Sequence, residues 1–184
     1  MRKGGCSMGK KVLALAGSPR KDGNSDLLCR AFLEAAARQG NDTEMIRLAD
    51  KRIAPCRACY ACRRGGCAQK DDMAEILEKM VQADVILLAS PLYFYSISAQ
   101  MKAMMDRTLA RWTEISDKKF FYIITAAQNN EKAADTALEC FRKYSGCFRG
   151  TEEGGHVFAA GVHRPGEVMQ TEYLKTAENL GESV

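Results

Sequence analysis

The chain has 184 residues and a formal net charge of +4, with 46% hydrophobic and 27% charged residues. This length suits one domain with a core of its own, and the composition is that of a globular rather than a disordered chain. The basic residues are scattered rather than grouped in a run, so we expect no nucleic-acid partner.

The amino-terminal stretch "MRKGGCSMGKK" is basic, and the apolar run after it, "VLALA", is too short for the core of a signal peptide. No apolar stretch reaches the roughly 20 residues that cross a bilayer, so we expect no membrane partner and a cytoplasmic protein. In that compartment the eight cysteines are reduced thiols or metal ligands rather than a disulfide framework. We predict a flexible extension over residues 1–9 and a single domain over 10–184.

Strand and helix signals alternate along the whole chain, starting with a buried strand that runs into a glycine turn. Strands are predicted over 10–18, 42–49, 84–91, 118–127 and 155–162, and the run over 84–91 is apolar almost throughout, as in a strand covered on both faces. Apolar residues at helical spacing predict helices over 24–40, 71–83, 98–112, 130–146 and 167–181. Five strands alternating with helices indicate an α/β fold, a doubly wound parallel sheet with helices on both faces.

Ligands of such sheets bind beyond the carboxyl ends of the strands, near the point where the strand order reverses. The loops to inspect therefore follow the first, third and fourth predicted strands. They read "GSPRKDGNS", "SPLYFYSIS" and "AAQNN".

The first loop matches neither Gly-x-Gly-x-x-Gly nor Gly-x-x-x-x-Gly-Lys-Ser/Thr, which argues against a dinucleotide fingerprint and a nucleoside triphosphatase. Ser18, Arg20, Asn24 and Ser25 offer donors beside a helix N-terminus, where backbone N–H groups and the helix dipole attract an anion. Asn24 or Ser25 can equally be a plain N-cap. Taken alone, the loop is either a phosphate site or a simple turn.

The second loop is apolar where a loop should be polar, because Pro91 precedes the aromatic run Tyr93, Phe94 and Tyr95. A flat aromatic cofactor would cover such a surface. The alternative is that these side chains bury against the domain's own helices or a partner subunit.

Together, "GSPRKDGNS" and "SPLYFYSISAQMKAMMDR" resemble the NADPH-dependent FMN reductase family of flavodoxin-like proteins, from the first strand to "GVHRPGEV". The resemblance implies a flavodoxin-like sheet of order 2-1-3-4-5 and a homodimer with FMN near its interface. It implies an oxidoreductase that passes electrons from NAD(P)H through FMN to a quinone, flavin, nitro or azo compound, or to a redox protein. The flavin then performs the chemistry, so we expect no catalytic acid or base.

The same resemblance assigns the cofactor-binding residues in three groups. The FMN phosphate would contact Ser18, Arg20, Asn24 and Ser25. The isoalloxazine ring would contact Pro91, Leu92, Tyr93 and Phe94, with further ring contacts from Ala126, Ala127 and Gln128.

Four cysteines, Cys56, Cys59, Cys62 and Cys67, fall in one short segment with spacings of two, two and four residues. Iron–sulfur clusters favour such compact thiolate runs, whereas zinc ribbons separate two cysteine pairs by about 15–20 residues. Ala68 follows the last cysteine where a ferredoxin run has proline, so the chain is not a ferredoxin.

This run resembles that of the iron–sulfur flavoproteins, which carry one [4Fe–4S] cluster between the second strand and the second helix. The resemblance implies these four cysteines as ligands, in a loop on the flavin side of the sheet. Related cysteine loops also occur in FMN reductases without a cluster, so free or occasionally oxidised thiols stay equally open. The alternative functions are therefore an electron-transfer protein with FMN and a cluster, which need not use NAD(P)H directly, or a flavin-free binding domain.

Overall fold

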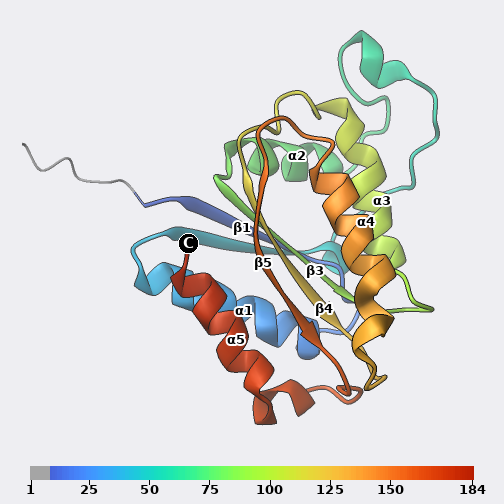
Figure 1. The fold of residues 1–184 in the computed structure, drawn as a ribbon. Helices are drawn as coiled ribbons and strands as arrows, with labels where there is room; N and C mark the ends of the chain where they lie inside the picture. Colours follow the sequence, from blue (N-terminus) through green and yellow to red (C-terminus); the bar gives the residue numbers. More distant parts are fainter. Residues whose placement is uncertain (1–8) are drawn as a thin grey trace, which may run out of the picture.

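The structure, a computed structural model, describes residues 9–184, so residues 1–8 of the predicted extension lie outside it. Five parallel strands form one sheet in the order β2-β1-β3-β4-β5, which confirms the predicted topology (Figure 1). The strands are β1 (Lys11–Ala16), β2 (Asp42–Arg47), β3 (Val85–Pro91), β4 (Lys119–Thr125) and β5 (Glu152–Ala159).

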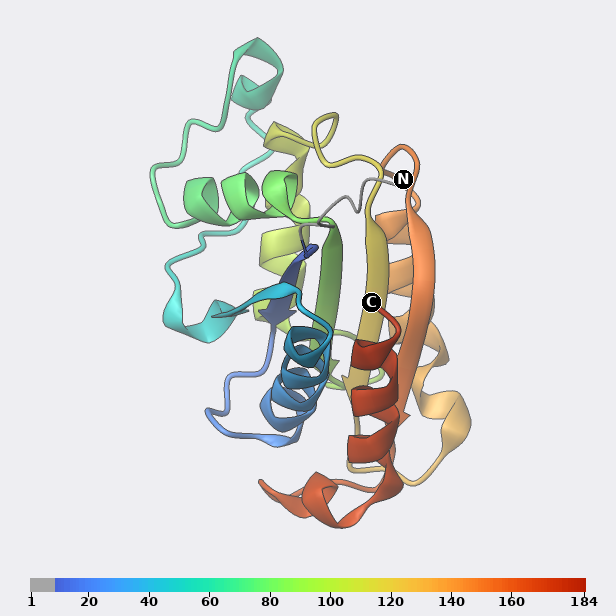
Figure 2. The same ribbon diagram turned by 90° about the vertical axis from the view of Figure 1, so that its left-hand side faces the viewer.

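Five α-helices cover the two faces of the sheet. They are α1 (Asn24–Arg38), α2 (Met73–Gln82), α3 (Ala99–Arg107), α4 (Asp135–Ser145) and α5 (Glu172–Glu182). Helices α1 and α5 lie side by side on one face, while α2, α3 and α4 cover the other (Figures 1 and 2). None of the helices formed by residues 9–184 has the length and apolarity needed to cross a bilayer.

The three central strands, β1, β3 and β4, are buried on both faces because each face of the sheet is covered by helices. In β1, Leu13 and Leu15 belong to the core beneath α2, α3 and α4, while Val12 and Ala14 belong to the core beneath α1 and α5. All four side chains are at most 3% exposed. Fully burying one such leucine contributes about 1.5–3 kcal/mol, so the two cores hold the sheet between its helices.

The ends of three predicted helices differ from the structure, because short 3₁₀ segments replace α-helical turns. The predicted helix 98–112 ends its α-helical part at Arg107, where the Thr108 hydroxyl donates to the carbonyl of Met105 at 2.7 Å. The predicted helix 130–146 begins with a 3₁₀ segment over Glu131–Ala134. The predicted helix 167–181 is interrupted at Thr171, whose φ of −124° and ψ of 159° are extended.

Strand β5 begins three residues before the predicted start, at Glu152. The missed residues are Glu152, Glu153 and Gly154, and both residue types are depleted in strands. Here β4 and β5 shift register between Phe120 and Phe121. A Cβ atom on Gly154 would lie 2.3 Å from the Phe121 ring, so only glycine fits against that aromatic side chain.

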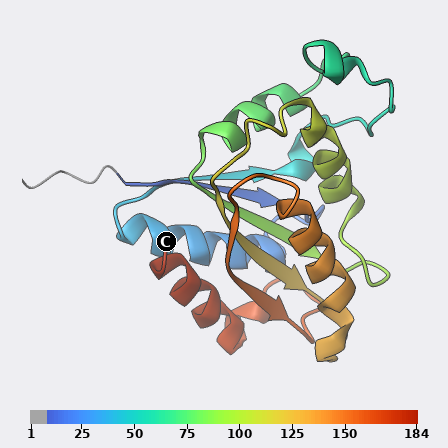
Figure 3. The ribbon, with the colours of Figure 1, turned by 45° about the horizontal axis from the view of Figure 1, so that its top comes forward.

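The segment between β2 and α2 projects beyond α2 and α3 (Figures 1 and 3). It contains the four closely spaced cysteines and two short 3₁₀ segments, Leu48–Asp50 and Ala61–Arg64. The rest of the described chain forms the sheet, its helices and their connections.

Candidate functional site

A cavity of about 530 Å³ opens at the carboxyl ends of β1, β3 and β4. The loops after these three strands meet there, as the strand order predicts. Ten of the eleven residues expected to bind a cofactor line it, namely Ser18, Arg20, Asn24, Ser25, Pro91, Leu92, Tyr93, Phe94, Ala126 and Ala127. Three parts of the chain therefore form the cavity. They are the polar loop after β1 (residues 17–25), the aromatic loop after β3 (residues 90–98) and an apolar wall after β4 (residues 126–127).

The polar loop leaves the N-terminus of α1 open to a ligand. The Ser18 hydroxyl accepts a 3.2 Å hydrogen bond from the backbone N–H of Arg20, and Gly23 N–H donates to the Arg20 carbonyl at 3.2 Å. Gly23 is the N-cap and provides no side-chain cap, so neither Asn24 nor Ser25 fills that role. The first N–H groups of α1, together with the helix dipole, are thus available to an anion.

Two predicted phosphate ligands also hold the loop that follows β5. Arg20 Nη1 donates to the His163 carbonyl at 3.0 Å, and Asn24 Nδ2 donates to the Arg164 carbonyl at 3.0 Å. Glu167 accepts from the backbone N–H groups of His163 and Arg164 at 2.7 and 2.9 Å. These contacts make the loop after β5 a further wall of the cavity.

Sequence reasoning missed this wall, which includes Val162, His163 and Pro165. The signal was present, because "HRPG" follows the last predicted strand at the same edge of the sheet.

Thr125, the last residue of β4, is a second missed lining residue. Its hydroxyl lies 2.8 Å from the Ser25 hydroxyl, and both side chains are buried. This contact joins the first turn of α1 to the end of β4, so it fixes the distance between the polar loop and the apolar wall.

The aromatic loop forms a tight two-residue turn at the rim of the cavity. Tyr93 and Ser96 exchange backbone N–H···O bonds of 2.9 and 3.0 Å, and between them Phe94 and Tyr95 have φ of +48° and +61°. Such turns favour Asn and Gly, because a residue with a Cβ atom pays about 1–2 kcal/mol for the left-handed conformation. Two bulky aromatic residues in strained backbone indicate a functional constraint.

The aromatic side chains of this turn do not bury against the domain's own helices. The exposed fractions of Tyr93, Phe94 and Tyr95 are 40%, 102% and 54%. Gln128, the eleventh predicted residue, does not line the cavity. Its amide nitrogen instead donates a 3.0 Å hydrogen bond to the Tyr95 hydroxyl. Gln128 therefore contacts the turn rather than the space behind it.

The cysteine segment lies apart from this cavity. Cys56 and Cys59 are exposed, Cys62 and Cys67 are partly buried, and none of the described cysteines forms a disulfide. No residue from 56 to 67 lines the cavity, so the four cysteines do not contact the space in which the cofactor is expected. The segment projects on the side of α2 and α3 instead (Figure 3).

The cysteine segment has an irregular backbone. Ala58 and Tyr60 have positive φ, and Arg63 stacks 4.7 Å above the Tyr60 ring. Across residues 9–184, no three His, Cys, Asp or Glu side chains gather in an arrangement that could hold a metal ion. The spacing of the four cysteines suits a cluster, but this conformation of the segment does not.

The base of the cysteine segment is closed by a buried ion pair. Arg107 donates to both carboxylate oxygens of Asp71 at 2.8 Å and to the Ala54 carbonyl at 2.7 Å. Ala54 N–H in turn donates to Asp71 at 3.0 Å. The hydrogen bonds from Arg107 lower the pKa of Asp71 to about 2, so its carboxylate is charged at neutral pH. Sequence reasoning missed this pair because its partners are far apart in the chain.

Residues 10–159 match the family model of the NADPH-dependent FMN reductases. The chain belongs to this family. Membership supports an NAD(P)H-dependent flavin oxidoreductase, in agreement with the expected fold and loops.

The relatives of this FMN reductase family member include archaeal proteins. An iron–sulfur flavoprotein from Methanocaldococcus jannaschii is 38% identical over 183 residues, which cover 95% of either chain. An iron–sulfur flavoprotein from Methanosarcina thermophila is 42% identical over 100 residues, which cover 54% of this chain and 52% of that protein. The longer match spans both the cavity loops and the cysteine segment.

Solved structures share the fold at lower identity. An NAD(P)H:quinone oxidoreductase from Methanothermobacter marburgensis has a TM-score of 0.73 at 20% identity, covering 95% of this chain and 96% of that one. An FMN-dependent NADH-azoreductase from Bacillus anthracis in complex with FMN has a TM-score of 0.71 at 20% identity, covering 93% and 97%. At these identities the likeness establishes the fold.

Proposed function

We propose that the cavity binds FMN and that the protein transfers electrons from NAD(P)H to a second substrate. The observation that carries this proposal is the meeting of three loops at one cavity of about 530 Å³, with anion-binding groups at one end and aromatic residues at the other. Cavities of a few hundred Å³ with a few convergent polar groups are the usual size for such a cofactor.

The residues present fit FMN at both ends. The open N-terminus of α1 and the side chains of Ser18 and Arg20 suit a phosphate monoester. Pro91, Leu92 and Ala126 offer an apolar surface for a flat ring. A bound FMN would supply the chemistry of hydride and electron transfer. The residues of the chain hold the phosphate, orient the ring and keep water from one face of it.

We further propose a homodimer, because the aromatic turn is exposed in the single chain. Phe94 and Tyr95 present apolar surface at the cavity rim, which a second copy of the chain, a nicotinamide or an aromatic acceptor would cover. The quinone and azo reductases of the same fold suggest an acceptor of that size. A cytoplasmic location would keep the exposed thiols reduced.

The test is the absorption spectrum of the purified protein and its affinity for FMN. We expect a yellow protein whose flavin is bleached by NAD(P)H without oxygen. Arg20→Ala should weaken FMN binding by about 10-fold, because it removes a charge-assisted hydrogen bond to the phosphate. Lys21→Ala is the matched control, since Lys21 is exposed on the same loop and does not line the cavity. A wild-type protein without FMN affinity would contradict the proposal.

A second candidate function adds a [4Fe–4S] cluster at Cys56, Cys59, Cys62 and Cys67. It is favoured by the relative that is 38% identical across nearly the whole chain and carries the name iron–sulfur flavoprotein. Compact thiolate runs suit such clusters. The segment between Ala54 and Asp71 would have to change conformation to bring the four thiolates together.

Iron and sulfide analysis after anaerobic purification tests this candidate. We expect about four iron atoms per chain, and loss of the iron in a Cys59→Ser variant. Cys147→Ser is the control, because Cys147 is also exposed but lies outside the segment. A fully yellow, NADPH-reducible protein that contains no iron would support the FMN-dependent oxidoreductase and exclude the [4Fe–4S] cluster.

A further inference from the structure

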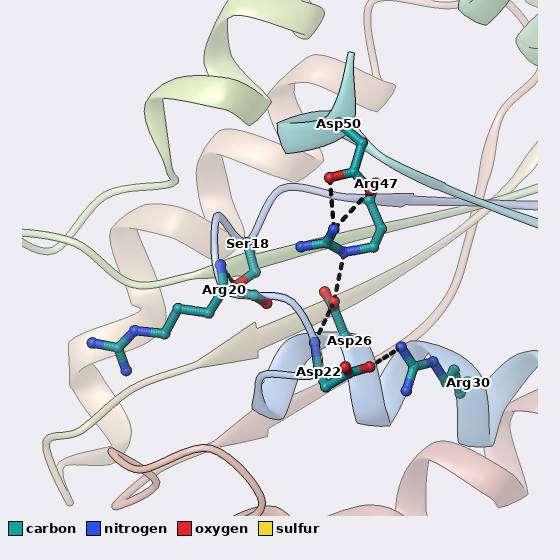
Figure 4. A network of polar contacts seen from close by, with 7 residues as sticks. All are labelled: Ser18, Arg20, Asp22, Asp26, Arg30, Arg47 and Asp50. Atoms are coloured by element: carbon teal, nitrogen blue, oxygen red, sulfur yellow. Dashed lines mark hydrogen bonds and ion pairs between the residues drawn. The ribbon is translucent and has the colours of Figure 1, made fainter.

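A buried ion pair lies beneath the polar loop of the cavity (Figure 4). Asp26, in the first turn of α1, is 0% exposed, and its Oδ2 atom accepts a 2.8 Å hydrogen bond from Arg47 Nε. The same oxygen accepts from the backbone N–H of Asp22 at 3.1 Å. Arg47 is the last residue of β2, so the pair joins three parts of the fold: β2, α1 and the loop between β1 and α1.

The contact to Asp22 fixes the shape of the polar loop. Asp22 has a φ of +56°, which is unfavourable for a residue with a Cβ atom. The carboxylate of Asp26 holds its N–H in that conformation, within the turn that the hydrogen bond from Gly23 N–H to the Arg20 carbonyl closes. The loop therefore depends on an acceptor at position 26.

The charge of that acceptor opposes the proposed ligand. A carboxylate in the first turn of a helix interacts with the positive end of the helix dipole, and its negative charge repels a phosphate bound at the same end. Burial raises the pKa of Asp26, and the hydrogen bond from Arg47 offsets part of this rise. Its second oxygen, Oδ1, is buried without a hydrogen-bond partner among residues 9–184. Such a group is costly unless its charge is compensated.

Arg47 is the residue placed to compensate it. Arg30 pairs with Asp22, and Arg20 is directed away from the pair toward the loop after β5 (Figure 4). Arg47 also contacts both oxygens of Asp50 at 2.7 and 2.8 Å, but that carboxylate is 63% exposed and therefore screened by water.

We infer that Asp26 and Arg47 are positioning residues for the phosphate of the cofactor, and that Arg47 sets the preference for FMN over riboflavin. The Asp26 carboxylate shapes the polar loop. Arg47 compensates the negative charge of that carboxylate, which lies beneath the proposed phosphate site. The inference rests on the proposed function, since it takes the polar loop as the phosphate site. Strand β2 contributes no residue to the lining of the cavity. Through Arg47 it would nevertheless influence which flavin the cavity prefers.

Binding of FMN and riboflavin to four variants tests the inference, because the two ligands differ only in the phosphate. Arg47→Met should weaken FMN binding by about 10-fold or more while riboflavin changes by less than about 3-fold. Asp26→Asn keeps an acceptor for Asp22 and removes the charge, so it should tighten FMN binding several-fold. The double variant should return FMN affinity to near the wild-type value. Asp50→Asn is the control and should leave both affinities unchanged.

Equal loss of both ligands in Arg47→Met, or no loss of either, would overturn the inference. Asp26→Asn provides an independent arm if the first variant is unfolded by circular dichroism, and weaker FMN binding there would also overturn it. A wild-type protein that binds neither flavin would instead contradict the proposed function. The two failures are therefore distinguishable.

Discussion

Arg107 on α3 and Asp71, two residues before α2, meet through two parallel N–H···O contacts of 2.8 Å each. Their side chains are 2% and 11% exposed, which makes this the charge pair on which the base of the cysteine segment depends. The Arg107 guanidinium also donates to the Ala54 carbonyl, so one side chain contacts both ends of the cysteine segment.

Removing either partner should destabilise the fold far more than removing a surface pair. We expect Asp71→Asn to lower the free energy of unfolding by about 3 kcal/mol, because Arg107 would keep a buried charge without its partner. Asp106→Asn is the control, since the exposed Lys102–Asp106 pair on the same helix should contribute less than about 1 kcal/mol. Urea unfolding followed by circular dichroism measures both. Similar losses in the two variants would contradict the role of burial.

The pair also predicts a pH dependence of stability. Because the pKa of Asp71 is lowered from 3.8 to about 2 in the folded state, the unfolded chain binds a proton first as the pH falls. The stabilisation is thus fully present above about pH 5 and is lost as the pH falls toward 2, amounting to about 2 kcal/mol. The difference in unfolding free energy between wild type and Asp71→Asn should shrink across this range. A difference that stays constant from pH 6 to 2.5 would refute it.

The aromatic turn predicts a trade-off between the stability of the fold and the affinity for ligands. Phe94→Gly should leave the urea midpoint unchanged or raise it, because glycine adopts positive φ freely and the exposed Phe94 side chain contributes no packing. The same variant should weaken binding of the flavin or of the nicotinamide, measured by fluorescence and by KM. Leu109→Ala, also exposed but outside the cavity, is the control. A destabilised variant with unchanged binding would show that the turn is structural.

Thiol labelling should separate the cysteines by burial. Burial, together with the nearby charge of Asp26, raises the pKa of Cys29, so its thiol stays protonated and inaccessible. We expect iodoacetamide to modify Cys147 and, after iron chelation, Cys56 and Cys59 in the folded protein, as read by peptide mass spectrometry. Cys29 should react only after unfolding. Equal rates at Cys29 and Cys147 would contradict the packing of α1.

The topology was predictable because local patterns determine it. The buried strands read as apolar runs, and a parallel sheet places their carboxyl ends at one edge. That is why ten of the eleven expected cofactor residues meet around one cavity although they come from three loops. Their role in binding FMN stays a prediction.

The features that the sequence did not reveal depend on contacts between distant residues. Arg107 and Asp71 are 36 positions apart, and Ser25 and Thr125 are 100 apart. No local pattern links either pair. The path of the cysteine segment likewise follows from positive φ at Ala58 and Tyr60 rather than from the spacing of its cysteines. The choice between a cluster and free thiols therefore stays a prediction as well.

The closed base of the cysteine segment makes residues 55–70 a separable module. Arg107 joins Ala54 to Asp71, so the sheet and the cavity are complete without the chain between them. Lengthening or shortening a surface loop costs little, because the entropy of closing it rises only slowly with its length. The length and composition of residues 55–70 can thus vary without rebuilding the core of the domain.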